Sequence, residues 1–321
     1  MTAGRDTVWL VGDVGATNAR FGLIAPDGAV LHSSRFADVD FPTIGDAIRA
    51  YLAQPGSLPA PRAGCVAVAA PVNGDAIRMT NHPWGFSVAA LRRELGFERF
   101  EVINDFTAVA LALPRLGPND RVPVGGGMPV PGRPIATLGP GSGLGVSALI
   151  PAGSGWLPLT GEGGHVTMPA VTARENAALE GMRRHFDHVS AERCLSGPGL
   201  VNLYNALAAV DGVPAAPYTA AQITDPAMSA QDPLCREAVA MFCAMLGTVA
   251  GDLALTLGAQ GGVYIAGGIV PRLGPRFVES GFRARFEAKG RLSPYLAAIP
   301  TYVVTHPLPA FLGCAAVLAA S

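Results

Sequence analysis

Two segments of this sequence follow the same plan: an apolar run, a glycine-rich turn with a hydroxyl residue, and a second apolar run. The first is VWLVGDVGATNARFGLIA, which begins at Val8, and the second is IATLGPGSGLGVSALI, which begins at Ile135. Short apolar runs joined by a glycine turn predict antiparallel β-strands. One such module near the start of each half of the chain predicts two halves that face each other across a cleft.

Strand and helix patterns alternate after the first module. Residues 29–36 extend it to three antiparallel strands, residues 43–54 have apolar positions at helical spacing, and residues 64–70 and 100–105 indicate buried strands. The alternation predicts an α/β fold with mixed sheets and crossover helices. Residues 116–134 hold a dense cluster of proline and glycine, which predicts a loop at a domain boundary.

The charged residues exclude several classes of partner and enzyme. The net charge is −1, with only 15% charged residues, so no strong field favours nucleic acid as a partner. The only lysine is Lys289, in EAKGR, which fits neither a Walker-type phosphate loop, nor a Schiff base, nor the lysine of protein kinases. Any phosphate must therefore be bound by backbone amides, a metal ion or arginine.

Other features predict a cytoplasmic protein without a membrane segment. The N-terminus runs directly into a strand pattern and lacks the apolar region of a signal peptide. The longest apolar stretch, residues 238–251, is too short to span a bilayer and predicts a buried helix. The five cysteines are scattered and never spaced C-x-x-C, which predicts reduced cysteines in the core.

The first glycine turn, Gly12–Asn18, has the chemistry of a phosphate-binding hairpin. Its backbone N–H groups can approach an anion closely, and Thr17 and Asn18 add side-chain donors. Asp13 would repel a bare polyphosphate, so it suits a turn that faces Mg²⁺ through water. An ordinary β-turn with an Asx hydrogen bond remains the alternative.

The second turn, Gly139–Gly145, is not a dinucleotide fingerprint. Val146 stands where G-x-G-x-x-G requires a third glycine, and a strand pattern follows instead of a helix. No G-x-S-x-G surrounds Ser142, so a nucleophile elbow is excluded as well. A second phosphate-binding hairpin and a flexible turn remain as interpretations.

Three further positions carry candidate chemistry. Asp105 follows a buried strand and precedes a helix pattern, so it suits either a general base for phosphoryl transfer or the N-cap of that helix. Glu162 and His165 stand three residues apart in GEGGH and can bind neighbouring sugar hydroxyls. Glu192 has the pattern of a surface charge. His185 and His188 lack the further ligands of a zinc site and are predicted to be solvated surface histidines.

The order of the motifs resembles that of the bacterial ATP-dependent glucokinases, members of the hexokinase and actin superfamily. The resemblance covers nearly the whole chain through six motifs: GDVGATNAR, VINDFTAVALALP, LGPGSGLGV, LTGEGGHV, AERCLSGPGLVNLY and VYIAGGIVPR. It implies a two-domain actin-like ATPase (ribonuclease H-like) fold with the active site in the interdomain cleft. It further implies a small domain of residues 1–112 with 303–321, a large domain of residues 113–302, and a homodimer.

The resemblance also implies roles for individual residues in the transfer of the γ-phosphate of MgATP to the 6-hydroxyl of glucose. Asp105 is similar to the catalytic base of the family. The positions similar to its sugar ligands are Asn104, Asp105, Glu162, His165 and Glu192. The positions similar to its nucleotide-binding turns are Gly12, Asp13, Val14, Gly15, Ala16, Thr17, Gly141, Ser142, Gly143, Gly267 and Gly268. No side chain is expected to coordinate the Mg²⁺ directly.

Two departures from the family pattern stand in these turns. Ala16 replaces a glycine that is common there, which narrows the backbone conformations available, and Ser142 replaces the usual threonine. Other sugar kinases, acting on mannose, fructose or glucosamine, remain alternatives. A sugar-responsive DNA-binding regulator would need a basic helix-turn-helix ahead of the first module, and a chaperone or filament ATPase would have little use for GEGGH beside Asn104 and Asp105.

Overall fold

The chain divides into two compact units. The computed structural model describes residues 7–320 except 55, 57 and 81. Unit 1 is Met1–Leu116 with His306–Ser321, and unit 2 is Gly117–Thr305. Both boundaries lie a few residues beyond the expected 112 and 302, because secondary structure of each unit continues past those points. Residues 1–6, on which the expectation about a signal peptide rested, lie outside the described residues.

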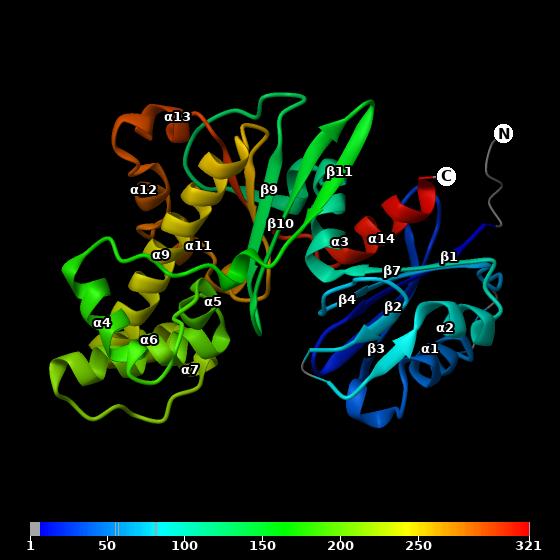
Figure 1. Cartoon of the computed structure of the whole chain (residues 1–321), viewed down its shortest axis with the longest axis horizontal. Helices are drawn as coiled ribbons and strands as arrows, with labels where there is room; N and C mark the ends of the chain where they lie inside the picture. The colour runs from blue at the N-terminus through cyan, green and yellow to red at the C-terminus, as the bar shows by residue number, and fades with distance from the viewer. Residues whose placement is uncertain (1–6, 55, 57, 81, 321) are drawn as a thin grey trace. The chain divides into compact units, whose positions relative to one another are not determined.

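Unit 1 is built on a five-stranded sheet with the order β3-β2-β1-β4-β7 (Figure 1). Its strands are β1 (Trp9–Val14), β2 (Asn18–Ile24), β3 (Val30–Ala37), β4 (Ala63–Val68) and β7 (Arg99–Asn104). The first three strands form an antiparallel meander, and β4 and β7 run parallel to β1. The predicted mixed sheet with three antiparallel strands at its start is confirmed.

Helices cover both faces of this sheet (Figure 1). The helices are α1 (Ile44–Leu52), α2 (Val88–Leu95), α3 (Asp105–Ala112) and α14 (Pro309–Ala319). Side chains alternate along β1, so Leu10 joins the core with α1 and α2, whereas Val11 joins the core with α3 and α14. The same alternation places Asp13 on the face covered by α3 and α14. Helix α14 crosses α3 so closely that a side chain at Gly313 would collide with the backbone of Ala108.

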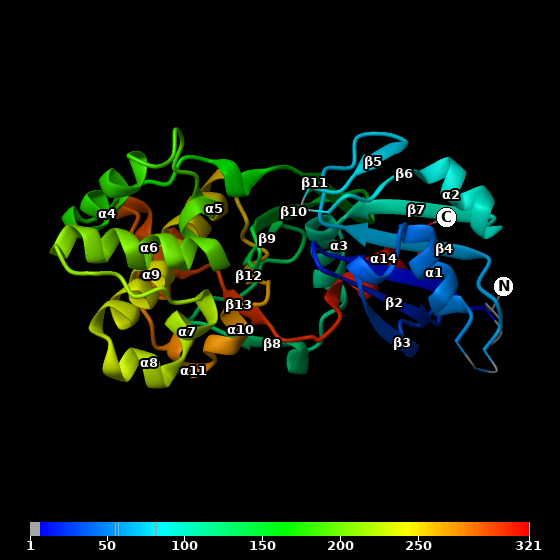
Figure 2. The same ribbon diagram turned by 90° about the horizontal axis from the view of Figure 1, so that it is seen from below.

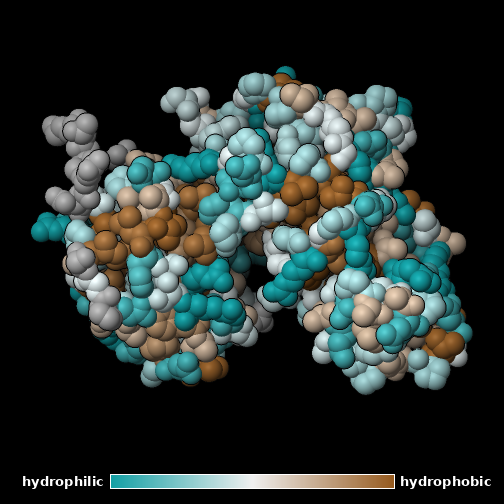
Figure 3. Space-filling model, turned by 180° about the vertical axis from the view of Figure 1, so that it is seen from behind, coloured by the Kyte–Doolittle hydropathy of each residue, from teal (hydrophilic) through white to brown (hydrophobic). Residues whose placement is uncertain are grey.

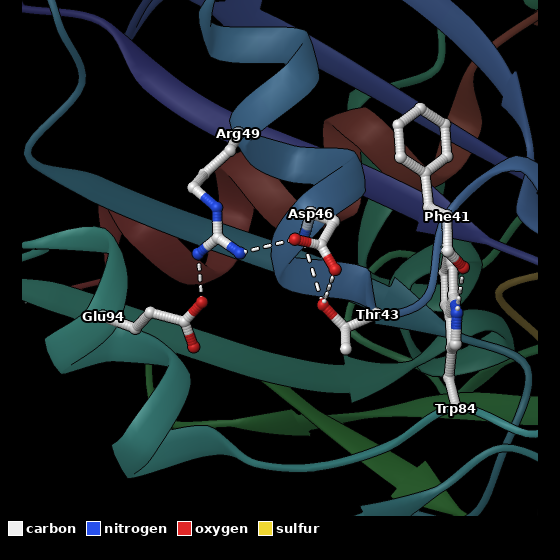
Figure 4. A network of polar contacts seen from close by, with 6 residues as sticks. All are labelled: Phe41, Thr43, Asp46, Arg49, Trp84 and Glu94. Carbon is white, nitrogen blue, oxygen red and sulfur yellow. Dashed lines mark hydrogen bonds and ion pairs between the residues drawn. The ribbon is translucent and has the colours of Figure 1, made fainter.

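A polar network ties α1 to its surroundings (Figure 4). The hydroxyl of Thr43 caps α1 by accepting from the Asp46 N–H at 3.1 Å, and Arg49 pairs with Asp46 and with Glu94 of α2. These ion pairs are half exposed, so each stabilises the unit only slightly. The indole N–H of Trp84 donates to the Phe41 carbonyl at 3.1 Å. Trp84 directly precedes β6 (Gly85–Ser87), which pairs with β5 (Ala76–Arg78) in a hairpin that the sequence patterns did not predict.

Unit 2 repeats the strand order of unit 1. Its sheet has the order β11-β10-β9-β12-β13-β8. The strands are β8 (Arg121–Pro123), β9 (Ile135–Pro140), β10 (Leu144–Ala152), β11 (Gly155–Thr160), β12 (Val263–Ile265) and β13 (Thr301–Val304). As in unit 1, three strands form an antiparallel meander, and two further strands run parallel to the first. The predicted similarity of the two glycine-turn modules therefore extends to the sheets that they begin.

The segment 116–134 is not entirely a loop, which corrects the prediction. It contains the 3₁₀ turn η3 (Pro118–Asp120) and the edge strand β8, which pairs antiparallel with β13. A three-residue strand that ends in a proline leaves no apolar period to detect, and an edge position tolerates the missing N–H of that proline.

Figure 2 shows the helices of unit 2 beside its sheet. Buried apolar side chains of these helices and strands form one continuous core. The longer ones are α4 (Ala173–Arg183), α6 (Gly197–Asp211) and α9 (Pro233–Leu257). The short ones are α5 (Ala191–Cys194), α7 (Ala220–Thr224), α8 (Pro226–Gln231), α10 (Val270–Leu273), α11 (Pro275–Val278), α12 (Phe282–Glu287) and α13 (Ser293–Ala297). Figure 3 shows that hydrophobic side chains also reach the surface in patches between hydrophilic ones.

Helix α9 contains the apolar stretch 238–251. Its 25 residues are long and apolar enough to cross a membrane, but 72% of its most apolar window is buried inside the fold. The stretch 238–251 lies within this longer helix, and the prediction of a buried helix is confirmed. All five cysteines are buried and free, as expected.

The single lysine has a structural role next to α9. Its Nζ donates to the Thr248 carbonyl at 3.2 Å and pairs with the Asp252 carboxylate at 2.5 Å. Lys289 thus ties the segment that follows α12 to α9.

Candidate active site

The first glycine turn joins β1 to β2 in unit 1. The Gly15 N–H donates to the Asn18 carbonyl at 3.0 Å, and the Asn18 side chain donates to the Thr17 hydroxyl at 2.7 Å. Arg35 of β3 donates to the Asn18 amide oxygen at 3.0 Å. No non-glycine residue among the described ones has a positive φ, so Ala16 adopts an ordinary conformation. The alanine therefore does not strain the turn.

Gly12 is buried beneath this turn. A Cβ on Gly12 would lie 2.9 Å from the Phe21 ring and 3.1 Å from Val66. The glycine at this position is thus explained by packing between β1 and its neighbours in the sheet. This packing does not by itself require contact with a phosphate.

Two carboxylates approach each other where the parallel strands of unit 1 end. The register aligns Val14 with Val68 and Val68 with Asn104, so β1, β4 and β7 end at the same edge of the sheet. Asp13 lies on β1 on the face covered by α3, and Asp105 is the first residue of α3. Burial raises the pKa of Asp105 to about 7, and the charge of Asp13 acts in the same direction. Burial also raises the pKa of Asp13, against the opposing charge of Arg20.

Asn104 caps helix α3 and orients Asp105. Its side-chain oxygen accepts from the N–H groups of Phe106 and Thr107 at 2.9 and 3.1 Å. Its amide nitrogen donates to Asp105 Oδ1 at 3.0 Å and to the Ala70 carbonyl at 3.3 Å. The N-cap is therefore Asn104 and not Asp105, which was the alternative interpretation of the sequence. Oδ2 of Asp105 accepts no hydrogen bond from the described part of the chain.

The second glycine turn joins β9 to β10 in unit 2. The Gly141 N–H donates to the Gly143 carbonyl at 2.8 Å, and Ser142 is exposed at the tip. The Leu144 N–H donates to Oε2 of Glu192 at 2.9 Å. Glu192 is only partly exposed, so it is not the simple surface charge that its sequence context indicated.

Glu162 directly precedes a short 3₁₀ turn, η4 (Gly163–His165), in the same unit, and His165 is the last residue of that turn. The His165 N–H donates to the Glu162 carbonyl at 3.0 Å, and both side chains are exposed. Neither side chain has a hydrogen-bond partner among the described residues, so both are open to a ligand. Gly164 is buried against the Leu144 carbonyl, where a side chain would collide. GEGGH therefore combines two exposed polar groups with a glycine required by packing.

Gly267 and Gly268 follow β12 and lie against the end of β9. Gly267 has φ +80°, and a Cβ there would collide with the Pro140 carbonyl. The Ile269 N–H donates to the same carbonyl at 3.3 Å. Two turns predicted to bind nucleotide, after β9 and after β12, thus meet at one edge of the unit 2 sheet.

The structure brings the predicted residues into two groups. Unit 1 holds the first turn, Asn104 and Asp105, whereas unit 2 holds the second turn, Gly267, Gly268, Glu162, His165 and Glu192. Sequence reasoning missed Leu144 and Gly164, which connect the second turn to Glu192 and to GEGGH. The double glycine of GEGGH was the one signal for such close packing.

The two histidines of HFDH were not predicted to be site residues. His185 and His188 are exposed, as expected, and follow the end of α4 at Arg183 instead of lying on a helix. His188 Nε2 lies 3.0 Å from the Thr167 hydroxyl. Their exposure agrees with solvated surface histidines.

Comparisons with known proteins cover nearly the whole chain. The Glucokinase family model matches residues 10–321. The glucokinase of Paramagnetospirillum magneticum is 57% identical over 309 residues, which cover 95% of this chain and 96% of that protein. The glucokinase of Aromatoleum aromaticum is 52% identical over 312 residues, covering 96% and 94% of the two chains.

Solved structures agree with the sequence comparisons. The crystal structure of a glucokinase from an Antarctic psychrotroph superposes with a TM-score of 0.89 at 38% identity, covering 99% of this chain and 100% of that one. A glucokinase of the ROK family from Streptomyces griseus, crystallised with glucose and AMPPNP, has a TM-score of 0.65 at 20% identity over 97% and 98% of the chains. The latter likeness concerns the fold alone. Since the family model and relatives more than half identical span nearly the entire sequence, this chain belongs to the glucokinase family.

Proposed function

We propose that Asp105 is the general base of the glucokinase reaction, in which the γ-phosphate of ATP passes to the 6-hydroxyl of D-glucose. Oδ2 of Asp105 accepts the hydroxyl proton as the sugar oxygen forms its bond to phosphorus and the bond to ADP breaks. The observation that carries this role is the environment of Asp105. It is partly buried, oriented through Oδ1 by Asn104, and has a pKa of about 7.

A pKa near neutrality suits this task. A carboxylate with an ordinary pKa is a weak base at pH 7, whereas a base near the working pH combines adequate basicity with a substantial ionised fraction. Burial and the charge of Asp13 raise the pKa of Asp105, whereas hydrogen bonds from Phe106 and Asn104 lower it. The chain thus sets the basicity of Asp105 through its own residues.

The proposed sugar ligands are Asn104, Asp105, Glu162, His165 and Glu192. Glu162 and His165 have exposed polar groups without protein partners in the described chain, which leaves them available for hydroxyl groups. Oε1 of Glu192 has no hydrogen-bond partner among the described residues either. The proposal requires the residues of units 1 and 2 to act on one sugar molecule.

The proposed nucleotide-binding elements are the two glycine turns and Gly267–Gly268. Backbone N–H groups in such turns bind phosphate oxygens without a lysine, which agrees with the structural role of Lys289. The expected positions are Gly12–Thr17 in unit 1 and Gly141–Gly143 in unit 2. Because Gly12 is buried, the exposed end of the first turn, around Thr17, has the better access to a phosphate.

The residues present also fit Mg²⁺. Asp13 has no hydrogen-bond partner in the described chain, and its charge adds to that of Asp105, so a cation would relieve this repulsion. Asp13 would hold the ion through water, as Mg²⁺ retains much of its hydration shell. When bound, the ion supplies charge neutralisation to the phosphate oxygens.

We also propose the finer properties that accompany this activity in the family. The repeated strand order of the two units supports an actin-like ATPase fold. A homodimer in the cytoplasm, acting at the entry to glycolysis, is proposed from family resemblance.

The test combines purified protein with MgATP and D-glucose and measures ADP and glucose 6-phosphate. We expect both products in equal amounts, and turnover of ATP without phosphorylated sugar would contradict the proposal. A panel of mannose, fructose and glucosamine tests the alternative sugar preference. A kcat/KM for one of these above that for glucose would reassign the substrate.

A further inference from the structure

The second glycine turn is bound to both segments that carry proposed sugar ligands in unit 2. Leu144 lies at the centre of these contacts. Its N–H donates to Glu192 Oε2 at 2.9 Å, and its carbonyl packs against Gly164 of η4. Leu144 therefore contacts both α5 and η4.

Further contacts connect the second glycine turn to the segment around α5. The Gly197 N–H donates to the Gly141 carbonyl at 2.8 Å, and a Cβ on Gly143 would lie 2.5 Å from Oε2 of Glu192. The Ala191 N–H donates to the Val166 carbonyl at 2.8 Å, which joins α5 to the residue after η4. We name these three segments, Gly141–Leu144, Gly163–His165 and Ala191–Gly197, the interlock.

The two oxygens of Glu192 have different roles in the interlock. Oε2 accepts the Leu144 N–H, while Oε1 has no hydrogen-bond partner among the described residues. A carboxylate can accept several hydrogen bonds at once, so a sugar hydroxyl can bind Oε1 without release of Leu144. Hydrogen bonds to an ionised carboxylate are stronger than neutral ones, which makes this a firm connection.

We propose that Glu192 is shared between the sugar and nucleotide subsites of unit 2 and couples their affinities within that unit. Gly143 is the positioning residue, because only glycine leaves room for Oε2 beside the turn. The inference rests on the proposed function, in which Glu192 binds sugar and the turn binds phosphate. Since coupling between two binding equilibria is reciprocal, a change on either side must be measurable on the other.

The first experiment changes the turn and measures the sugar. Gly143→Ala places a methyl group against Glu192 Oε2, whereas Gly181→Ala, in α4 of the same unit, has nothing within 4 Å of its Cβ. Glucose binding is measured by calorimetry without nucleotide. We expect Gly143→Ala to weaken glucose binding about 10-fold or more through the displaced carboxylate, and Gly181→Ala to bind as the wild type does.

The second experiment changes the sugar side and measures the nucleotide. Glu192→Ala removes the acceptor of the Leu144 N–H, whereas the His165 side chain makes no hydrogen bond to the turn within the described part of the chain. AMPPNP binding is measured without sugar. We expect Glu192→Ala to weaken it several-fold and His165→Ala to leave it unchanged, although both variants lose glucose affinity.

The two experiments separate the interlock from the proposed function. A wild type that binds no glucose contradicts the proposed function and removes the basis of the coupling. A wild type that binds glucose, with equal glucose affinities for Gly143→Ala and Gly181→Ala, overturns the coupling alone. Equal AMPPNP affinities for Glu192→Ala and His165→Ala overturn the coupling as well. If thermal melting shows that Gly143→Ala is not folded, the comparison of Glu192→Ala with His165→Ala alone decides.

Discussion

The two units share one strand order, but different polar side chains lie where the first strand of each sheet ends. In unit 1, β1 carries Asp13 on the face of α3, whose first residue is Asp105. In unit 2, the turn after β9 has no acidic residue of its own and receives the carboxylate of Glu192 from α5. One backbone plan can therefore support proton transfer in one unit and ligand binding in the other.

The difference arises from the segment after the last parallel strand of each sheet. In unit 1, β7 ends at Asn104, which caps α3 and places Asp105 at the start of that helix. In unit 2, the matching strand β13 ends at Val304, and the chain then passes to α14 of unit 1. Unit 2 therefore has no helix of its own directly after this strand to place an acid in the equivalent position.

The largest expected effect comes from removing the proposed base of unit 1. Asp105→Asn should lower kcat by roughly 10²–10⁴, because the proton of the sugar hydroxyl loses its acceptor. Glucose affinity should change little. Steady-state kinetics and calorimetry check both quantities.

The control for this variant is Asp27→Asn. Asp27 is a carboxylate of the same unit and lies in the exposed turn before β3, far from Asp105 in the sequence. Its kcat should match that of the wild type. An Asp105→Asn enzyme with at least a tenth of wild-type kcat would contradict the assignment of catalysis to unit 1.

A smaller effect is expected from a matched pair of glycines in unit 2. Gly267→Ala introduces a side chain at φ +80° and against the Pro140 carbonyl, whereas Gly268→Ala has nothing within 4 Å of its Cβ. Gly267→Ala should lower the free energy of unfolding by about 1–3 kcal/mol and raise the KM for ATP. Denaturant unfolding should show Gly268→Ala close to the wild type, and equal stability of the two variants would refute the packing argument.

The acid pair of unit 1 predicts a pH dependence. Asp105 accepts a proton only when ionised, so kcat should rise with pH as the carboxyl loses its proton around its pKa of about 7, and then level off. Asp13→Asn removes a negative charge that raises this pKa, so the rising limb should move to lower pH. Profiles of kcat against pH for both proteins test this, and a limb that stays in place would show that the two carboxylates do not interact.

The smallest effect is expected at Ala16 in the first turn. This residue has no positive φ, so Ala16→Gly relieves no strain there. The KM for ATP should change by less than about 2-fold, with a slight loss of stability from the added freedom of glycine in the unfolded chain. Tighter ATP binding by this variant would show that alanine restricts the turn after all.

Much of the fold was predictable because periodicity is local. The alternation of apolar residues in β1 and the glycine between two apolar runs identify a hairpin without knowledge of the rest of the chain. Strand β8 was missed because three residues at a sheet edge carry no period.

The candidate site was only partly predictable from its residues. Asp105 at the end of a buried strand had a pattern typical of a ligand site, yet the same pattern fitted a helix cap, and the cap proved to be Asn104. The sequence around Gly12 matched a phosphate-binding turn. In the structure Gly12 is buried against Phe21 and Val66, so packing explains the glycine. Glu192 contacts Leu144 across 48 residues of sequence, a distance over which no motif carries information.

The amino-acid sequence alone establishes the two glycine turns, the order of strands and helices in the two modules, and the absence of a phosphate-binding lysine motif. These features depend on neighbouring residues, because backbone conformation and apolar periodicity are set within a few positions along the chain. The folded structure was needed to show that Asp13 raises the pKa of Asp105 and that Gly143 must leave room for Glu192. Charge interaction, desolvation and close packing act through space, and the distances that govern them exist only in the folded chain.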